Sequence, residues 1–178
     1  MPGWDLFDAI SQALGDDLPI IAEDLGIITD EVNALREHFG FPGMKVLQFA
    51  FDSTDENAYL PHHFESPVCV CYTGTHDNAT TLSWYETLPE HCRQKVCAYT
   101  GTTDEKNIGY GLIKTALSSI ATYAIYPLQD LLFCGDEGRM NTPGKATGNW
   151  SWRFRAQDLK PEYADTLREL TLLYGRFD

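Results

Sequence analysis

The chain has 178 residues, 43% of them hydrophobic, which is enough apolar material to bury the core of one globular domain or a large part of one. Acidic residues outnumber basic ones by 26 to 13, and the formal net charge at pH 7 is −13. We therefore expect no nucleic acid and no anionic membrane as partners, because most faces would repel them, whereas neutral ligands are compatible with this charge.

The first third of the chain predicts a helix, a strand and a second helix. Apolar residues recur at helical spacing from Trp4 to Leu14, which indicates an amphipathic helix. Residues 18–25, "LPIIAEDL", are short and rich in isoleucine, as in a strand that is buried on both faces. Thr29 is the expected N-cap of a helix over residues 30–39, whose first turn is acidic.

The rest of the chain continues to alternate. At residues 44–51 and 67–72, residue types alternate with a period of two, so that one set would share each face of an extended chain, and this pattern predicts strands. The later segments, in order, are helices at 89–99 and 111–124, a strand at 124–132 that Pro127 interrupts, a long Gly- and Asn-rich loop at 133–152, and a closing helix at 161–177. Such alternation predicts an α/β fold with about four parallel strands joined by right-handed crossovers.

Polar residues cluster where these strands end, which is where parallel α/β folds place their active sites. They are Glu23, Asp24, Asp52, His76, Asp77, Gln129 and Asp130. A lone carboxylate after a strand is most often a cap or turn residue, but several on converging strands suit glycosyl transfer, in which one acid donates a proton and another stays ionised. The pleat sends Glu23 and Asp24 to opposite sides, although spacing alone does not say which one is the catalyst.

The segment "TGTHDN" concentrates hydrogen-bonding groups, His76, Asp77 and Asn78, directly after a buried strand, as expected for a site that binds a polyhydroxylated ligand. A metal site built from the same residues with His62 and His63 is a weaker interpretation, because adjacent histidines on an extended segment diverge. The tryptophans near these loops could stack on sugar rings or anchor the loops in the core, and the sequence leaves both readings open: Trp84, Trp150 and Trp152.

Targeting and cysteine patterns are consistent with a cytoplasmic protein. The first ten residues lack a basic region followed by an apolar core, and no apolar stretch reaches membrane-spanning length. The five cysteines are odd in number and match no common zinc pattern, so free buried thiols in a reducing compartment fit better.

Six motifs together resemble a known family. In chain order they are "LPIIAEDLGIITDEVNALREHFGFPGMKVLQFAFD", "NAYLPHHF", "YTGTHDNATT", "PLQDLL", "RMNTPG" and "GNWSWR". They occur in this order in the C-terminal part of the 4-alpha-glucanotransferases, also called amylomaltases or disproportionating enzymes. The resemblance implies the C-terminal half of a TIM (β/α)8 barrel, with residues 1–178 forming the last four units and the closing helix.

The same resemblance implies an activity and a set of site residues. Enzymes of this family cut an alpha-1,4-glucan, hold one part as a covalent glycosyl-enzyme and pass it to another glucan, without a cofactor. By resemblance, Glu23 is the general acid/base and Asp77 the transition-state stabiliser. His76 is similarly expected to bind sugar hydroxyls, with Asn141 and Gln48 as further substrate-binding residues.

Two departures from the family pattern shape the expectations. Ala79 stands where the family usually has an acidic residue after "THDN". The nucleophilic aspartate of the family belongs to an earlier strand, so we expect this chain to be a fragment that is inactive until the missing N-terminal half of the barrel is supplied as its partner.

Two alternatives stay open at this point. A non-catalytic module that binds alpha-1,4-glucans and maltooligosaccharides would keep the pocket residues without turnover. A two-fold dimer could rebuild a barrel from two halves, but it would need Asp52 or Asp130 as a recruited nucleophile.

Overall fold

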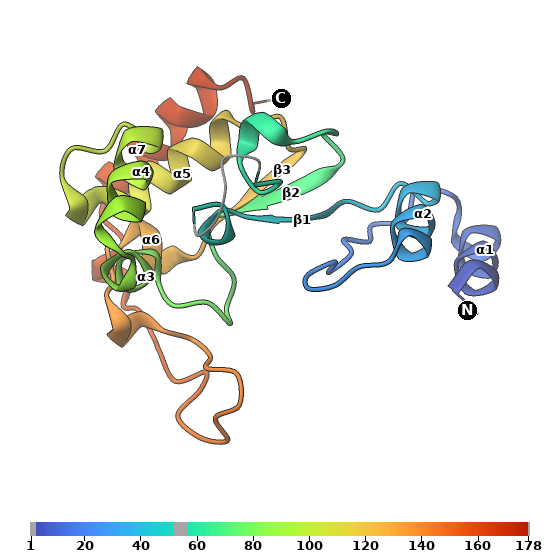
Figure 1. The fold of residues 1–178 in the computed structure, drawn as a ribbon, viewed down its shortest axis with the longest axis horizontal. Helices are drawn as coiled ribbons and strands as arrows, with labels where there is room; N and C mark the ends of the chain where they lie inside the picture. The colour runs from blue at the N-terminus through green and yellow to red at the C-terminus, as the bar shows by residue number, and fades with distance from the viewer. Residues whose placement is uncertain (1–2, 52–56, 178) are drawn as a thin grey trace.

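A three-stranded parallel sheet lies at the centre of the computed structural model, which describes residues 3–51 and 57–177 (Figure 1). The strands are β1 (Gly43–Val46), β2 (Cys69–Tyr72) and β3 (Tyr123–Ile125), in that order across the sheet. Met44 pairs with Val70, and Val70 pairs with Tyr123. The parallel arrangement confirms the predicted α/β class and brings the carboxyl ends of all three strands to one edge.

The predicted strand at residues 18–25 is not present as regular structure in the described chain. This segment is irregular, and one backbone hydrogen bond, from Ala22 N to Pro42 O at 2.9 Å, joins it to the approach to β1. A strand is defined by a ladder of such bonds, so apolar composition without a continuous partner does not make one. Across the described residues, three of the four expected strands are therefore present.

Two other strands are shorter than the sequence predicts. Residues 44–51 leave the sheet after Val46 and turn into a 3-10 helix at Leu47–Phe49. Residues 124–132 leave it after Ile125, because Pro127 has no N–H for a ladder and instead caps the short helix α6 (Leu128–Leu131). Asp52, expected after the second strand, lies outside the described residues.

The five predicted helices form, but the helix expected at 111–124 begins earlier, at Ile108, and ends at Ser118, and Tyr123 and Ala124 belong to β3 instead. The five helices are α1 (Gly3–Leu14), α2 (Asp30–His38), α4 (Glu90–Thr100), α5 (Ile108–Ser118) and α7 (Pro161–Leu173). The sequence did not predict α3 (Thr81–Thr87), which begins where the Thr80 hydroxyl accepts a hydrogen bond from Ser83 N at 3.3 Å. Among the described residues, no helix combines the length and apolarity needed to cross a membrane.

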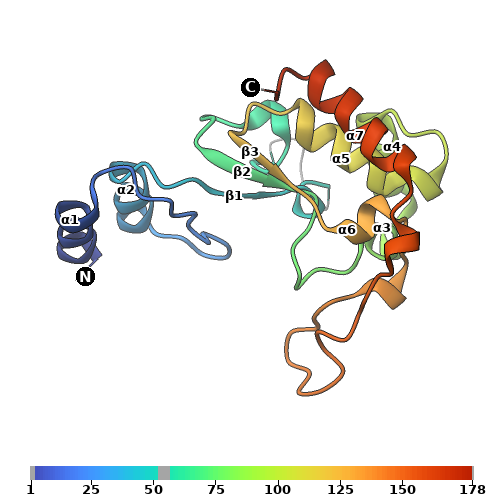
Figure 2. The ribbon, with the colours of Figure 1, turned by 180° about the vertical axis from the view of Figure 1, so that it is seen from behind.

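Helix α5 is the centre of packing. It is buried along most of its length, and its residues belong to both hydrophobic clusters. Leu112 packs in the cluster that joins the sheet to α3 and α4, whereas Ile113 packs with Leu131 and Leu170 of α6 and α7. One helix therefore ties the sheet to the C-terminal part of the chain (Figure 2).

Helices α1 and α2 stand apart from α3 to α7, which gather on the other side of the sheet (Figures 1 and 2). Along these two helices, all of whose residues are described, none is fully buried. Aromatic contacts hold them to each other and to the approach to β1, with ring centroids of Trp4 and His38 4.9 Å apart and those of Phe7 and Phe41 also 4.9 Å apart. We call residues 3–42 the N-terminal arm.

The side chain of Arg176 closes the end of α5 after α7 has ended. Its guanidinium donates to the carbonyls of Leu117 at 2.6 Å, Ser119 at 2.8 Å and Ala121 at 2.9 Å. The last carbonyls of a helix have no partner within the helix, so this cation satisfies the Leu117 carbonyl near the end of α5 and that of the C-cap Ser119, and it complements the negative end of the helix.

We expect Arg176→Ala to lower the free energy of unfolding by about 2 kcal/mol, because hydrogen bonds from a charged donor are lost together. Urea denaturation followed by circular dichroism measures this loss. Arg168→Ala is the matched control, since Arg168 is an exposed arginine on α7. An equal and small effect of both substitutions would show that the Arg176 contacts contribute little.

Candidate active site

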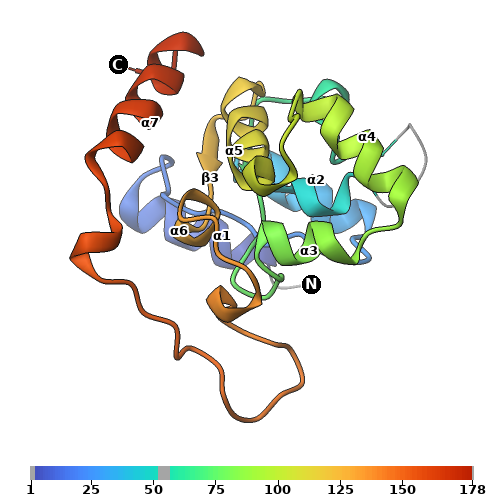
Figure 3. The same ribbon diagram turned by 90° about the vertical axis from the view of Figure 1, so that its left-hand side faces the viewer.

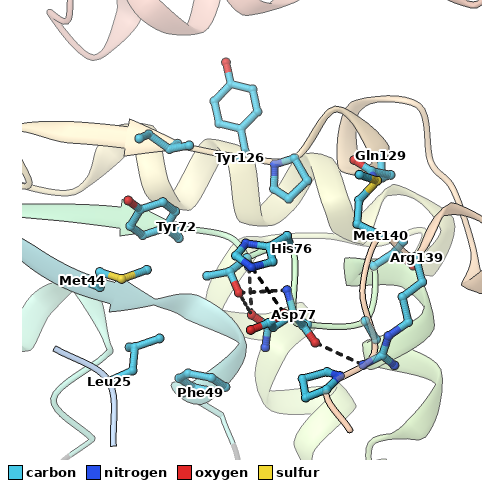
Figure 4. Close-up of a pocket in the computed structure, with 18 of the residues that line it drawn as sticks. Leu25, Met44, Phe49, Tyr72, His76, Asp77, Tyr126, Gln129, Arg139 and Met140 are labelled. Carbon is cyan, nitrogen blue, oxygen red and sulfur yellow. Dashed lines mark hydrogen bonds and ion pairs between the residues drawn. The ribbon is translucent and has the colours of Figure 1, made fainter. Parts of the chain in front are cut away.

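The loop between β2 and α3 carries His76 and Asp77. Asn78 shapes this loop, because its side-chain oxygen accepts hydrogen bonds from Thr75 N at 2.8 Å and from the Thr75 hydroxyl at 2.9 Å. This local turn leaves the side chains of His76 and Asp77 about half exposed, at 52% and 49%. Both lie on a cavity of about 740 Å³ at the carboxyl edge of the sheet (Figure 4).

Asp77 is held by a second loop that follows α6. Asn141 Nδ2 donates to Asp77 Oδ1 at 2.6 Å, and the Arg139 guanidinium donates to the Asp77 carbonyl at 3.1 Å. The backbone joins in, since Asn141 N donates to the His76 carbonyl at 3.1 Å. His76 Nε2 lies 3.4 Å from the same Asp77 oxygen. The two loops thus meet on one carboxylate.

Four segments line the cavity. They are residues 21–25 of the N-terminal arm, residues 44–49 at the end of β1, residues 72–80 after β2, and residues 125–143 after β3. The wall is mostly apolar, with Phe49, Tyr72 and Tyr126 presenting rings and a few polar side chains between them. The volume of the cavity is within the usual range of small-molecule binding sites in proteins.

Glu23 lies on the same cavity as His76 and Asp77, so the structure brings these three predicted residues together. Its side chain is exposed. Glu23 interacts electrostatically with Tyr72. Burial raises the pKa of the Tyr72 hydroxyl, and the negative charge of Glu23 adds to that rise. The cavity therefore has a carboxyl group on the arm and another on the loop after β2.

Asp24 faces the other way, as the alternation predicts. Its Oδ1 accepts a hydrogen bond from Met44 N at 2.7 Å, and its Oδ2 lies 3.3 Å from Arg36 Nε, at ion-pair distance but without hydrogen-bond alignment. Gly43 packs so closely on this carboxylate that a Cβ would collide with it. Asp24 thus fastens the arm to β1 and to α2 next to Glu23.

Gln48 and Asn141 are placed differently from each other. Gln48 is 4% exposed and lies behind the cavity wall, where its Nε2 donates to the Ala79 carbonyl at 3.1 Å. Asn141 is half-buried and points at Asp77. In both cases the contacts support the loop after β2, and direct binding of substrate by either side chain stays a prediction.

The tryptophans fall into two groups. Trp84 packs against the core, with its ring centroid 6.2 Å from that of Phe51. Trp150 is 52% exposed and lies beside the site, 5.1 Å from the His76 ring. Its backbone has a φ of +58°, a left-handed conformation that bulky residues rarely adopt, and its N–H donates to Met140 O at 2.7 Å.

The histidines at 62 and 63 do not join His76. Their rings lie 4.1 Å apart, His62 Nδ1 bonds the Tyr99 hydroxyl at 2.8 Å, and His63 Nδ1 contacts the Asn57 carbonyl at 3.1 Å. In the part of the chain that the structure describes, no three His, Cys, Asp or Glu side chains converge as a metal site would require.

Sequence reasoning missed Arg139 and Tyr72, which both line the cavity. The signals for Arg139 were its place at the start of the motif "RMNTPG" and its position in the long loop at 133–152, which Figure 3 shows running out from α6 and returning toward α7. Tyr72 was recognised as a strand residue, and its cavity-facing side could not be assigned before the sheet was known.

We expect Asp24→Ala to loosen the arm beside Glu23. Amide hydrogen exchange at Met44 measures this, because that N–H donates to Asp24. Loss of a charged acceptor should accelerate exchange by roughly tenfold or more. Asp24→Asn retains an acceptor and should accelerate exchange less, and Asp16→Ala, at an exposed aspartate of the same arm, should have no effect. Unchanged exchange at Met44 in Asp24→Ala would contradict the anchoring role.

Comparison with known proteins now identifies the family. The 4-alpha-glucanotransferase family profile matches residues 1–159. The 4-alpha-glucanotransferases of Synechocystis sp. and Thermus thermophilus are 51% and 47% identical to this chain, over 98% and 95% of it and 35% of each relative. The solved amylomaltase from Streptococcus agalactiae, in complex with acarbose, superposes with a TM-score of 0.92 at 36% identity, covering 99% of this chain and 36% of that one.

The chain therefore spans about a third of the length of the relatives that it matches. The structural match, together with the parallel sheet and its flanking helices, confirms the predicted relation to the TIM-barrel fold of the amylomaltases. The match over most of the sequence and the specific motifs lead to one conclusion: this chain belongs to the 4-alpha-glucanotransferase family.

Proposed function

We propose that this chain carries part of the active site of a retaining 4-alpha-glucanotransferase, which transfers alpha-1,4-glucan segments between maltooligosaccharides. The observation that carries the proposal is the convergence of Glu23, His76 and Asp77 on one cavity of about 740 Å³. The amylomaltase from Streptococcus agalactiae, whose structure is a complex with acarbose, supports a saccharide as the ligand.

Glu23 is the proposed general acid/base. It protonates the glycosidic oxygen as the bond to the donor sugar breaks, and the leaving glucan departs with a free 4-hydroxyl. In the second half of the reaction it accepts the proton of an acceptor 4-hydroxyl while the new glycosidic bond forms. Its exposed position on the arm leaves it free to reach a bond held in the cavity.

Asp77 is the proposed stabiliser. A carboxylate held on one side by Asn141 has a fixed position from which to offset the positive charge that develops on the sugar ring in the transition state. His76, half exposed beside it, is the proposed donor to a sugar hydroxyl. The ring of Trp150 extends this side of the site.

We propose that the nucleophilic aspartate comes from the two thirds of the relatives' length that this chain does not match. Residues 1–178 then form one partial-barrel domain, and the irregular segment at 18–25 becomes a strand when it gains a second neighbour. The five cysteines are free in the structure, which supports a reducing compartment such as the cytoplasm.

A chimera tests the proposed function. Residues 1–178 replace the matching segment of the Synechocystis enzyme, and glucose release from maltotriose reports transfer. The chimera should be active, and Glu23→Gln and Asp77→Asn should each lower kcat by roughly 10²- to 10⁴-fold, because each removes a group that acts in the transition state. The matched control is Glu65→Gln, at an exposed carboxylate outside the cavity.

The isolated 178-residue chain is the companion experiment. We expect no glucose release above buffer, because the nucleophile is proposed to lie elsewhere. Robust turnover by this chain alone would contradict the shared site, and near-normal activity of the Glu23→Gln chimera would contradict the role of Glu23. Binding of maltooligosaccharides by an inactive chimera would favour a glucan-binding module instead.

A further inference from the structure

Two adjacent residues of α6, Gln129 and Asp130, are buried although they are polar, with exposures of 6% and 3%. Asp130 does not line the cavity, and the proposed chemistry uses neither residue. Burying a polar group destabilises the folded state unless the group is hydrogen-bonded, so the hydrogen-bond partners of Gln129 and Asp130 indicate their structural role.

The Asp130 carboxylate holds both ends of the loop that carries His76 and Asp77. Its Oδ2 accepts a hydrogen bond from the Thr73 hydroxyl at 2.6 Å, where β2 ends. Its Oδ1 accepts one from Thr81 N at 3.2 Å, where α3 begins. Burial raises the pKa of this carboxyl, and the hydrogen bonds from Thr73 and Thr81 oppose the rise. Both neighbours are donors, which is the arrangement that an acceptor-only carboxylate satisfies.

Gln129 holds the other loop. Its Nε2 donates to the Gly138 carbonyl at 2.9 Å, and a Cβ on Gly138 would lie only 3.1 Å from Gln129 Cγ. Gly138 directly precedes Arg139, and both Arg139 and Asn141 donate to Asp77. The Thr80 hydroxyl also donates to the Gly135 carbonyl at 3.0 Å and so links the two loops at a second point.

We propose that Gln129 and Asp130 act together as positioning residues. They hold the loop after β2 and the loop after α6 in the relative position at which Arg139 and Asn141 contact Asp77. In this Gln129–Asp130 clamp, Asp130 lies behind the cavity wall and Gln129 forms part of the wall, and the two act on the loops through Thr73, Thr81 and Gly138. The effect of the clamp on catalysis rests on the proposed function, but its effect on the loops does not.

Amide hydrogen exchange on the 178-residue chain tests the clamp without any activity. In Asp130→Ala, exchange should accelerate at least tenfold at Thr81, whose N–H donates to Asp130, and also at Asn141, whose N–H donates to the His76 carbonyl. Exchange at Cys71 in the middle of β2 should change less than twofold, which shows that the sheet is intact. Asp136→Ala, at an exposed aspartate of the same region, is the matched control.

Two milder variants keep the test decisive if Asp130→Ala does not fold. Thr73→Val retains the volume of this fully buried side chain and removes one donor, so it should accelerate exchange at Asn141 in the same direction. Asp130→Asn can still accept from Thr81 and donate to Thr73, so it should restore most of the protection. Acceleration at Thr81 with no change at Asn141, in any of these variants, would overturn the proposal.

Steady-state kinetics of the chimera test the effect of the clamp on catalysis. Loosening a stabiliser should lower kcat by about 10- to 100-fold with less than a threefold change in KM, and Asp130→Asn should recover most of kcat. An unchanged kcat in Asp130→Ala would overturn the catalytic part of the proposal. If the parent chimera is inactive, the proposed function fails while the exchange experiment still decides on the clamp.

Discussion

The parallel pairing of β1, β2 and β3 is the constraint on which the site depends. Parallel strands end at the same edge of a sheet, so the loops after β1, β2 and β3 emerge side by side whatever their sequence. The packing of α5 between the sheet and α7 keeps this edge in place. Of the predicted site residues, Glu23, His76 and Asp77 line one cavity, whereas Gln48 and Asn141 support the loop after β2 from outside its lining.

Side chains, more than backbone ladders, fix the loops at that edge. The side chain of Asp24 accepts a hydrogen bond from Met44 N, that of Asn78 accepts one from Thr75 N, and that of Asp130 accepts one from Thr81 N. Each such bond contributes only about 0.5–1.5 kcal/mol net, or about 1.5–3 kcal/mol when one partner is charged. The bonds of Asn78 and Asp130 hold the loop that carries Asp77, whereas the bond of Asp24 holds the arm that carries Glu23.

The adjacent carboxylates of "AEDLG" have separate tasks for a geometric reason. Alternation along an extended backbone presents Glu23 to the cavity and Asp24 to β1 and α2. In "PLQDLL" a helix separates the pair instead: Gln129 and Asp130 both lie on α6, where neighbouring side chains point in different directions around the helix axis, so that Gln129 reaches the loop after α6 and Asp130 reaches the loop after β2.

The sequence by itself determined the five longer helices, the α/β class and the family, because helical periodicity and dense local motifs are properties of neighbouring residues, whereas it missed the short helices α3 and α6. It also placed Glu23 and Asp77 as the carboxylates to examine. Only the tertiary structure decided that residues 18–25 lack a ladder, that Gln48 lies behind the wall and that Asn141 holds Asp77. Strand pairing, burial of a side chain and a contact between distant loops each need a partner far away in the chain. Patterns among neighbouring residues do not identify that partner.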